Sequence, residues 1–320
     1  MAATEVYKVS DLTHKYGWDF LAYMANLGVN VPGNAQVLFV DSNGTNTLDA
    51  DDGEHGHSFV LPLATLDYAI GLATDGQGDV ILIAPGHTET LTAATSCVVD
   101  KSDLTIIGLG TGLNRPTFSL GTATTAKIDV SSANVTIKNI RVVSALADMG
   151  EGLDAEATAN GLWLEDCDFR DGGADNLELV IGVSLAAECD DVTILNCEFR
   201  TVAAGGCASA IMATAGNDRL RIEGCHVFGT YSAACIDADA TTAHLEILIQ
   251  DNNLLNQHAT GDCIKLYTGT TGGCIRNMCG QASGSIDSAI DGDDAIYLFE
   301  NLEVDAAAVT GTLIPATAAS

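Results

Sequence analysis

Two acidic side chains are the best candidates for chemistry in this chain. Asp168 and Glu198 stand in nearly identical tripeptides, D-F-R and E-F-R. If these tripeptides lie on neighbouring strands, their carboxyl groups are about 5 Å apart, the separation typical of retaining glycosidases. Arg170 and Arg200 follow on the same strand face, so a surface lattice of ion pairs also explains the four residues. We favour the lattice, because a sugar-cleaving groove usually also supplies aromatic platforms and the sequence shows none for this pair.

A second group of acidic residues lies in the segment 49–57, which reads D-A-D-D-G-E-H-G-H. Four of its carboxylates are candidate calcium ligands: Asp49, Asp51, Asp52 and Glu54. The segment lacks the EF-hand spacing, so a solvated loop is the favoured interpretation. Asp237 and Asp239 form a further pair on one strand face, but nothing stacks on them from the neighbouring coils. The sequence therefore predicts no metal, no cofactor and no catalytic residue.

These side chains belong to a repeated phrase, such as T-I-L-N-C from Thr193 and R-I-E-G-C from Arg221. A hydrophobic anchor recurs in each copy at Ile106, Ile137, Leu164, Ile194, Ile222, Ile249 and Ile275. Two residues after each anchor stands a residue that tolerates the left-handed backbone conformation. This turn column comprises Gly108, Asn139, Asp166, Asn196, Gly224, Asp251 and Asn277. A repeat of this length with a bend in every copy indicates a solenoid.

Strand alternation explains the phrase better than helical periodicity. The sequence predicts an all-β fold, a right-handed parallel β-helix whose coils rise by about 4.8 Å each. Each coil is expected to hold two strands, with Phe169 and Phe199 stacked inside and a second column running from Val183. The position between anchor and bend faces outward, and apolar examples such as Ile107 and Leu195 are expected to bury against a partner copy.

Four segments are predicted along the chain. Residues 1–36 form an N-terminal arm with a short helix, and residues 37–78 hold an entry strand, the acidic loop and a capping helix that begins after Thr65. Residues 79–302 form the β-helix, and residues 303–320 form a C-terminal extension. The arm carries aromatic candidates for partner contact, which are Tyr7, Tyr16, Trp18, Phe20 and Tyr23.

The composition limits the classes of partner. Lys and Arg number 13 against 43 Asp and Glu, a net charge of −30, which disfavours nucleic acid and acidic polysaccharide backbones and favours a basic surface. The ten cysteines show no C-x-x-C pair, and Cys167, Cys197 and Cys225 fall in the inward column, so we expect reduced core thiols. No apolar run is long enough to predict a membrane span, and no apolar signal segment follows Met1.

The entry region resembles pectate-lyase-like β-helix proteins. The resemblance rests on P-L-A-T-L-D-Y-A-I from Pro62, D-V-I-L-I-A-P-G-H-T-E-T from Asp79 and L-T-I-I-G-L-G from Leu104. Together with V-D-S-N-G near Val40, N-R-P-T-F from Asn114 and repeats of the N-C-E-F-R type, the chain looks like bacteriophage virion proteins of that superfamily. The calcium-binding aspartate cluster and the arginine of the lyases have no recognisable counterpart in the sequence.

The resemblance covers residues 37–302 and implies the fold more strongly than the function. It implies a non-enzymatic phage virion protein, a homotrimeric capsid decoration or cement protein on the capsid exterior that contacts the major capsid protein. Such a protein would be made in the cytoplasm of the bacterial host. The alternative is a tailspike or tail-associated glycan-binding protein, with a polysaccharide hydrolase that uses Asp168 and Glu198 as one form of it. A cellular carbohydrate lyase is a third hypothesis.

Overall fold

A computed structural model describes residues 31–173, 176–202, 207–239, 241–281, 289–292, 295–305 and 312–314. The helix expected near the N-terminus and the aromatic residues Tyr7, Tyr16, Trp18, Phe20 and Tyr23 lie outside these ranges. The expected role of the arm in partner contact therefore stays a prediction.

The described strands form three long sheets, and not the two walls that the sequence suggested. Sheet A comprises β1 (Val37–Val40), β2 (Val80–Ile83), β5 (Thr105–Gly108), β8 (Thr136–Lys138), β11 (Trp163–Glu165), β14 (Thr193–Leu195), β17 (Arg221–Glu223), β20 (Ile247–Gln250), β23 (Gly272–Ile275) and β26 (Ile296–Phe299). Sheet B comprises β3 (Thr88–Leu91), β6 (Thr117–Leu120), β9 (Arg141–Ser144), β12 (Asp168–Arg170), β15 (Glu198–Arg200), β18 (His226–Gly229), β21 (Asn253–Asn256), β24 (Met278–Gln281), β27 (Asn301–Asp305) and β28 (Thr312–Ile314). Sheet C comprises β4 (Val98–Val99), β7 (Ile128–Val130), β10 (Met149–Ala155), β13 (Leu179–Leu185), β16 (Ser209–Ala213), β19 (Ala234–Ala238), β22 (Asp262–Leu266) and β25 (Ile290–Asp291).

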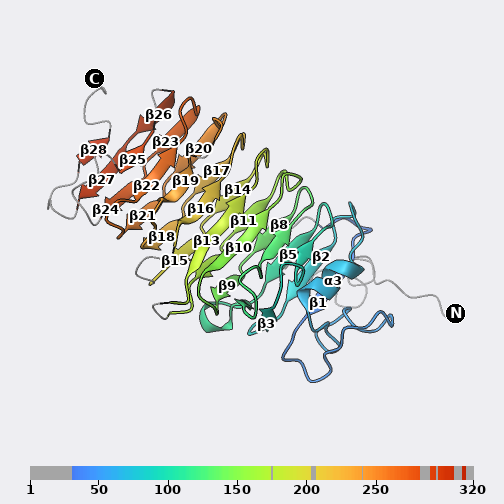
Figure 1. Cartoon of the computed structure of the whole chain (residues 1–320). Helices are drawn as coiled ribbons and strands as arrows, with labels where there is room; N and C mark the ends of the chain where they lie inside the picture. Colours follow the sequence, from blue (N-terminus) through green and yellow to red (C-terminus); the bar gives the residue numbers. More distant parts are fainter. Residues whose placement is uncertain are drawn as a thin grey trace.

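Neighbouring strands of each sheet come from successive coils, so the chain winds through sheets A, B and C in turn (Figure 1). The pairs are parallel along each sheet, for example β11 with β14 and β10 with β13, whereas β28 pairs antiparallel with β27. The predicted parallel β-helix is confirmed.

Side chains of equal position stack inside the coils. The rings of Phe169 and Phe199 lie 5.1 Å apart and almost parallel, at 8°, as the strand register of β12 and β15 requires. The column from Val183 continues through β16, β19 and β22 as predicted. The sequence pattern predicts Ile296 as its next member, but Ile264 pairs with Ile290 and Ile296 belongs to sheet A, so the next member is Ile290.

The bend between sheets A and B has the predicted left-handed conformation in the middle coils, with φ from 53° to 66° at Asn139, Asp166, Asn196, Gly224 and Asp251. The two ends of the turn column are corrections. Gly108 ends strand β5 without a positive φ, and the positive φ angles before β6 lie at Gly110 and Gly112. In the last predicted coil the left-handed residue is Arg276 and not Asn277. The bend lies one residue earlier because Cys274, and not Ile275, pairs with the anchor Ile249.

Asn277 instead belongs to a buried asparagine ladder with Asn252 and Asn301. The side-chain amide of Asn252 donates to the carbonyl of Ile222, and its Oδ1 accepts from the backbone N–H of Cys225, at 3.0 and 2.8 Å. In the middle coils this inward position is occupied by Cys167, Cys197 and Cys225. In the later coils, toward the C-terminal end, the asparagines of the ladder occupy it. All ten cysteines of the chain are free and buried.

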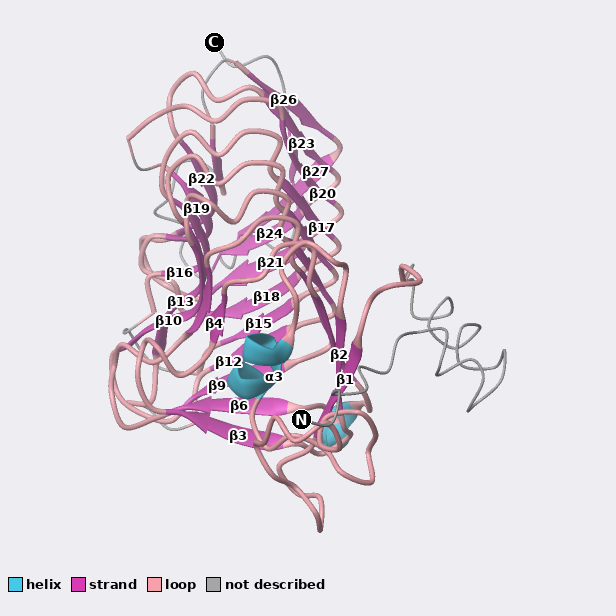
Figure 2. Cartoon of the chain, turned by 90° about the vertical axis from the view of Figure 1, so that its right-hand side faces the viewer, coloured by secondary structure: helices cyan, strands magenta, loops and turns pink. Residues whose placement is uncertain are grey.

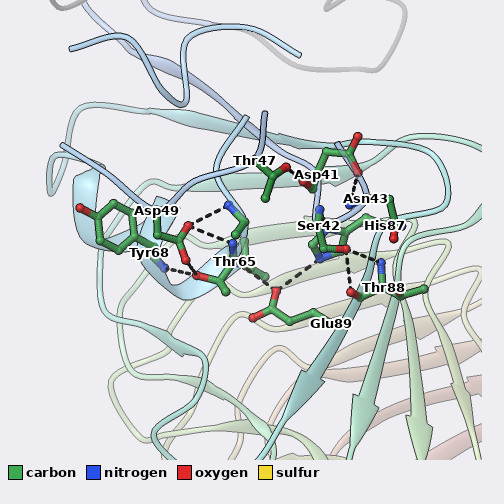
Figure 3. Close-up of polar contacts among 12 residues, drawn as sticks. Asp41, Ser42, Asn43, Thr47, Asp49, Thr65, Tyr68, His87, Thr88 and Glu89 are labelled. Carbon is green, nitrogen blue, oxygen red and sulfur yellow. Dashed lines mark hydrogen bonds and ion pairs between the residues drawn. The ribbon is translucent and has the colours of Figure 1, made fainter. Parts of the chain in front are cut away.

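The N-terminal end of the coils is closed by helix α3 (Leu66–Leu72), which lies across the interior in Figure 2. Thr65 caps the helix by accepting from the backbone N–H of Tyr68, and Leu66, Ala69 and Ile70 are buried, as predicted. Asp49 holds the cap in place because it accepts from the Thr65 hydroxyl at 2.9 Å (Figure 3). A short 3-10 helix, η1 (Gly112–Asn114), follows β5.

A buried histidine ties the entry strand to the first coil. His87 accepts from the backbone N–H of Ser42 through Nδ1 at 3.0 Å, and its Nε2 lies 3.3 Å from Glu89 (Figure 3). Glu89 in turn accepts from the backbone N–H of Leu66 at the start of α3. This network is structural, because His87 is fully buried. The helices described are too short and too polar to span a membrane.

One expected partner surface is covered by the chain itself. Ile107 is outward-facing but only 2% exposed, because it packs in a small outer cluster with Phe39, Val80 and Leu82. Its burial against a partner copy was a wrong expectation. Leu195 lies in β14 and is half-buried, so its contact with a partner stays a prediction.

Candidate active site

The first predicted pair lies in sheet B, where Asp168 and Glu198 are opposite each other on β12 and β15. Asp168 is fully buried, and arginines surround it: Arg141 at 2.8 Å, Arg170 at 2.5 Å and Arg115 at 3.6 Å. Arg170 also reaches Glu198 at 3.4 Å. Each carboxylate is therefore neutralised by its neighbours, and the arrangement is a lattice of ion pairs with no free acid.

The carboxylates of the acidic loop do not converge on a common point. Asp49 caps α3, and Asp52 accepts from the backbone N–H groups of Glu54 and His55 at 2.9 Å each. These backbone hydrogen bonds, with the His55 side chain, lower the pKa of Asp52. Asp51 and Glu54 are exposed. Within the described residues the loop forms a cap and a turn, with no set of three converging metal ligands.

A different group of carboxylates does converge, on the outward face of sheet C. Asp129 of β7 pairs in register with Asp154 of β10, and Glu156 follows just after β10. Oxygen atoms from the three side chains all lie within 4.8 Å of one another. We call this group, with Lys127 and Glu151, the first sheet C cluster.

Lys127 distinguishes the two paired aspartates. Its Nζ forms an ion pair with Asp154 and another with Glu151 at 3.2 Å. Burial by itself lowers the pKa of Lys127, but the hydrogen bond and charge of Asp154 and the charge of Glu151 raise it overall. A lysine held in this way is an anchor for Asp154 and is poorly suited to accept a proton.

Asp129 has the opposite environment. Its Oδ1 is buried and has no hydrogen-bond partner among the described residues. Burial raises the pKa of Asp129, Lys127 opposes that rise, and the charges of Glu156 and Asp154 add to it. Two carboxyl groups side by side, one ion-paired and one with a raised pKa, are the arrangement that separates an acid from a base.

The donor set also suits a hard cation. Calcium and magnesium are bound by carboxylate oxygens, and the unpartnered Oδ1 of Asp129 is a free ligand atom beside Asp154 and Glu156.

Sequence reasoning missed the first sheet C cluster because its members come from separate phrases. Asp129 stands in I-D-V and Asp154 in L-D-A, both outside the repeated T-I-L-N-C pattern. Only the register of β7 and β10 brings them together. The shared apolar-Asp-apolar tripeptide is the one signal that could have found the pair.

Neither family models nor curated proteins match this chain. Solved structures do. The chain is similar to pectate lyase Pel9A, with a TM-score of 0.52 and 15% identity over 87% of this chain and 70% of that one. It is also similar to a rhamnogalacturonan lyase (TM-score 0.47, 13% identity, 83% and 87% covered) and to the GH136 lacto-N-biosidase from Eubacterium ramulus (TM-score 0.41, 11% identity, 93% and 71% covered). The chain thus has the pectate-lyase-like parallel β-helix fold.

These comparisons correct one prediction. The expectation that the chain is not an enzyme is contradicted, because the solved structure that it resembles with a TM-score of 0.52 is named a pectate lyase. Nothing in them indicates a bacteriophage origin. The virion location, the homotrimer and the capsid partner stay predictions that no comparison tests.

Proposed function

We propose that this chain is a glycan-cleaving enzyme, a glycoside hydrolase that works on the outward face of sheet C. The observation that carries the proposal is the in-register pair Asp129 and Asp154, one with a raised pKa and an unpartnered oxygen and the other ion-paired with Lys127. The fold shared with pectate lyase Pel9A supports an enzyme that acts on carbohydrate. The site thus replaces the pair first suggested by the sequence, Asp168 and Glu198.

The roles follow from the two environments. The carboxyl of Asp129, protonated, donates its proton to the glycosidic oxygen as the bond to the anomeric carbon breaks. The carboxylate of Asp154 attacks the anomeric carbon and forms a covalent glycosyl ester, since oxygens within 4.8 Å fit the short separation of retaining enzymes. A water molecule then gives its proton to Asp129 and its hydroxyl to the sugar, which releases Asp154. Lys127 keeps Asp154 in place.

A second candidate function is cation-dependent elimination, as the word lyase in several neighbours' names suggests. Its support in this structure is the convergence of Asp129, Asp154 and Glu156 around the unpartnered Oδ1. A divalent cation held there would neutralise an acidic sugar. The two functions differ in product, because elimination leaves an unsaturated sugar that absorbs ultraviolet light and hydrolysis does not.

The test is digestion of a glycan panel, with new reducing ends and ultraviolet absorbance measured together. We expect reducing ends without absorbance, unaffected by a chelator, and at least a hundredfold loss in Asp129→Asn. The matched control is Glu198→Gln, in the sheet B lattice, which should retain full activity. Absorbance that a chelator abolishes would establish the lyase instead. Equal cleavage by wild type and Asp129→Asn would refute both assignments.

A further inference from the structure

A second charged cluster lies on the same face, at the other end of sheet C. Asp237 of β19, Lys265 of β22 and Asp291 of β25 are in register with one another. Asp262 begins β22, and Lys265 forms an ion pair with Asp239 at 2.6 Å. The expectation that nothing stacks on Asp237 and Asp239 from the neighbouring coils is therefore wrong. We call these five residues the second sheet C cluster. β7 and β22 are five strand spacings apart in the sheet, about 24 Å.

Asp262 is the unusual member of the second sheet C cluster. It is only 9% exposed, yet in the described part of the chain its carboxylate makes no hydrogen bond or ion pair. Burial and the neighbouring charge of Asp291 raise its pKa to about 6, against the opposing charge of Lys265, and Cys263 and Asp237 add to the rise. A buried charge is costly unless it is paired. This carboxylate therefore lacks the partner that a structural role would supply.

The charge of the two clusters indicates the class of ligand. Together they hold eight carboxylates against Lys127 and Lys265, and both lysines are engaged in ion pairs. Such a face repels a polyanion and attracts a cation. In the second sheet C cluster the carboxylates do not converge as the first cluster's do, since the described residues contain one set of three within 4.8 Å, around Asp129. A larger cation that carries several hydrogen-bond donors suits the second sheet C cluster better than a metal ion does.

We propose that the face of sheet C binds a glycan bearing primary amines, with the ammonium group of an amino-sugar residue received by Asp262 and Asp291. The inference rests on the proposed function and specifies its substrate class. An ammonium group offers three donors, which the unpartnered carboxylate of Asp262 and the exposed Asp291 can accept. The glycan then extends along the sheet from Asp262 toward Asp129.

The test is calorimetric binding of glucosamine oligomers, of the same oligomers fully N-acetylated, and of uronic acid oligomers of matched length. The experiment uses the Asp129→Asn protein, so that cleavage does not interfere. We expect glucosamine oligomers to bind, with affinity that falls as salt rises, and the acetylated and uronic acid series to bind at least tenfold more weakly. Adding Asp262→Asn should weaken the glucosamine oligomers about tenfold to a hundredfold, the range expected for loss of a charged hydrogen bond.

The control is Glu188→Gln, which removes an exposed carboxylate in the turn after β13 and should leave binding unchanged. Circular dichroism verifies that each variant is folded. Equal binding of acetylated oligomers, or no effect of Asp262→Asn, would overturn the amine site. Cleavage of amine-free glycans without glucosamine binding would overturn it while leaving the proposed function intact. Binding that depends on Asp262, with no cleavage of any glycan, would support the amine site and count against the hydrolase.

Discussion

At the level of single residues, the two aspartates of the first sheet C cluster differ because of what surrounds them. Asp154 is 9% exposed and is tied to Lys127, whereas Asp129 is flanked by the negative charges of Asp154 and Glu156, and its Oδ1 has no hydrogen-bond partner among the described residues. A proton donor needs its proton at the working pH. The charge of Glu156, outside strand β10, therefore helps to set the pH range in which Asp129 can act.

Glu156→Gln tests this dependence. The pKa of Asp129 is raised, and an acid catalyst loses activity as the pH rises through its pKa. Removal of the negative charge at position 156 lowers that pKa, so the alkaline limb of the rate profile should move to lower pH. The measurement is kcat/KM against pH for wild type and variant. If the alkaline limb stays at the same pH, the charge of Glu156 does not set the pKa of the catalytic acid.

Asp262→Asn is expected to stabilise the fold. The folded-state pKa of about 6 lies above the usual value of 3.8, so the residue contributes stability below pH 4 that is lost as the pH rises through 6. At pH 8 the variant should gain roughly 1 kcal/mol after allowance for solvent screening at the rim of the site. At pH 3 the two proteins should unfold alike in urea. A loss of stability at pH 8 would mean that the carboxylate has a partner.

At the level of elements, the asparagine ladder holds the bend between sheets A and B in the last coils. Asn252 satisfies the buried carbonyl of Ile222 and the buried N–H of Cys225. In the preceding coils the same column holds cysteines, which fill space and make only weak, long contacts such as that of Cys197 Sγ with the Leu195 carbonyl at 3.4 Å. The two halves of the column therefore stabilise the bend by different means.

Asn252→Ala should cost roughly 2 to 4 kcal/mol, because it leaves two buried backbone groups unsatisfied. The adjacent Asn253 is exposed on β21, so Asn253→Ala serves as the control and should change stability by less than about 0.5 kcal/mol. Urea unfolding of both variants supplies the comparison. Equal costs would show that the ladder is not what holds this bend.

The features that the sequence predicts well are those in which one short segment holds all the information. The bends at Asn196 and Asp251 follow from residue type alone, and Phe169 and Phe199 stack because their phrases match. The candidate site depends on the register between two segments that share no repeated phrase. Asp129 lies beside Asp154 only because the connecting chain has the length that sets the register of β7 and β10. Sheet C also begins with strands of two and three residues, β4 and β7, which are too short to show a periodicity.

At the level of the whole molecule, charge opposes the compact state. With 13 basic side chains for 43 acidic ones, at least 43 − 13 = 30 carboxylates have no cation to pair with one to one. Self-repulsion of this kind destabilises a folded protein and is screened by salt.

The melting temperature should accordingly rise as sodium chloride increases from 10 to 150 mM, over which the screening length falls from about 30 to about 8 Å. Differential scanning calorimetry measures the change, and sodium sulfate at equal ionic strength separates screening from salting-out. A melting temperature that falls with salt would mean that ion pairs such as Arg141 with Asp168 outweigh the repulsion.

The stacking of coils in sheet C fixes the distance between the first and the second sheet C cluster. Between Asp129 and Asp262 lie only whole coils, because every neighbour in the sheet order belongs to the next turn of the chain. The gap between the two clusters can therefore change only in steps of one strand spacing, about 4.8 Å, by gain or loss of a complete coil such as residues 185–212. A change in the length of a turn leaves this distance unaltered. The length of the glycan that spans both clusters is thus set by the number of coils between them. A duplication of one coil within the gene would lengthen that distance by one strand spacing.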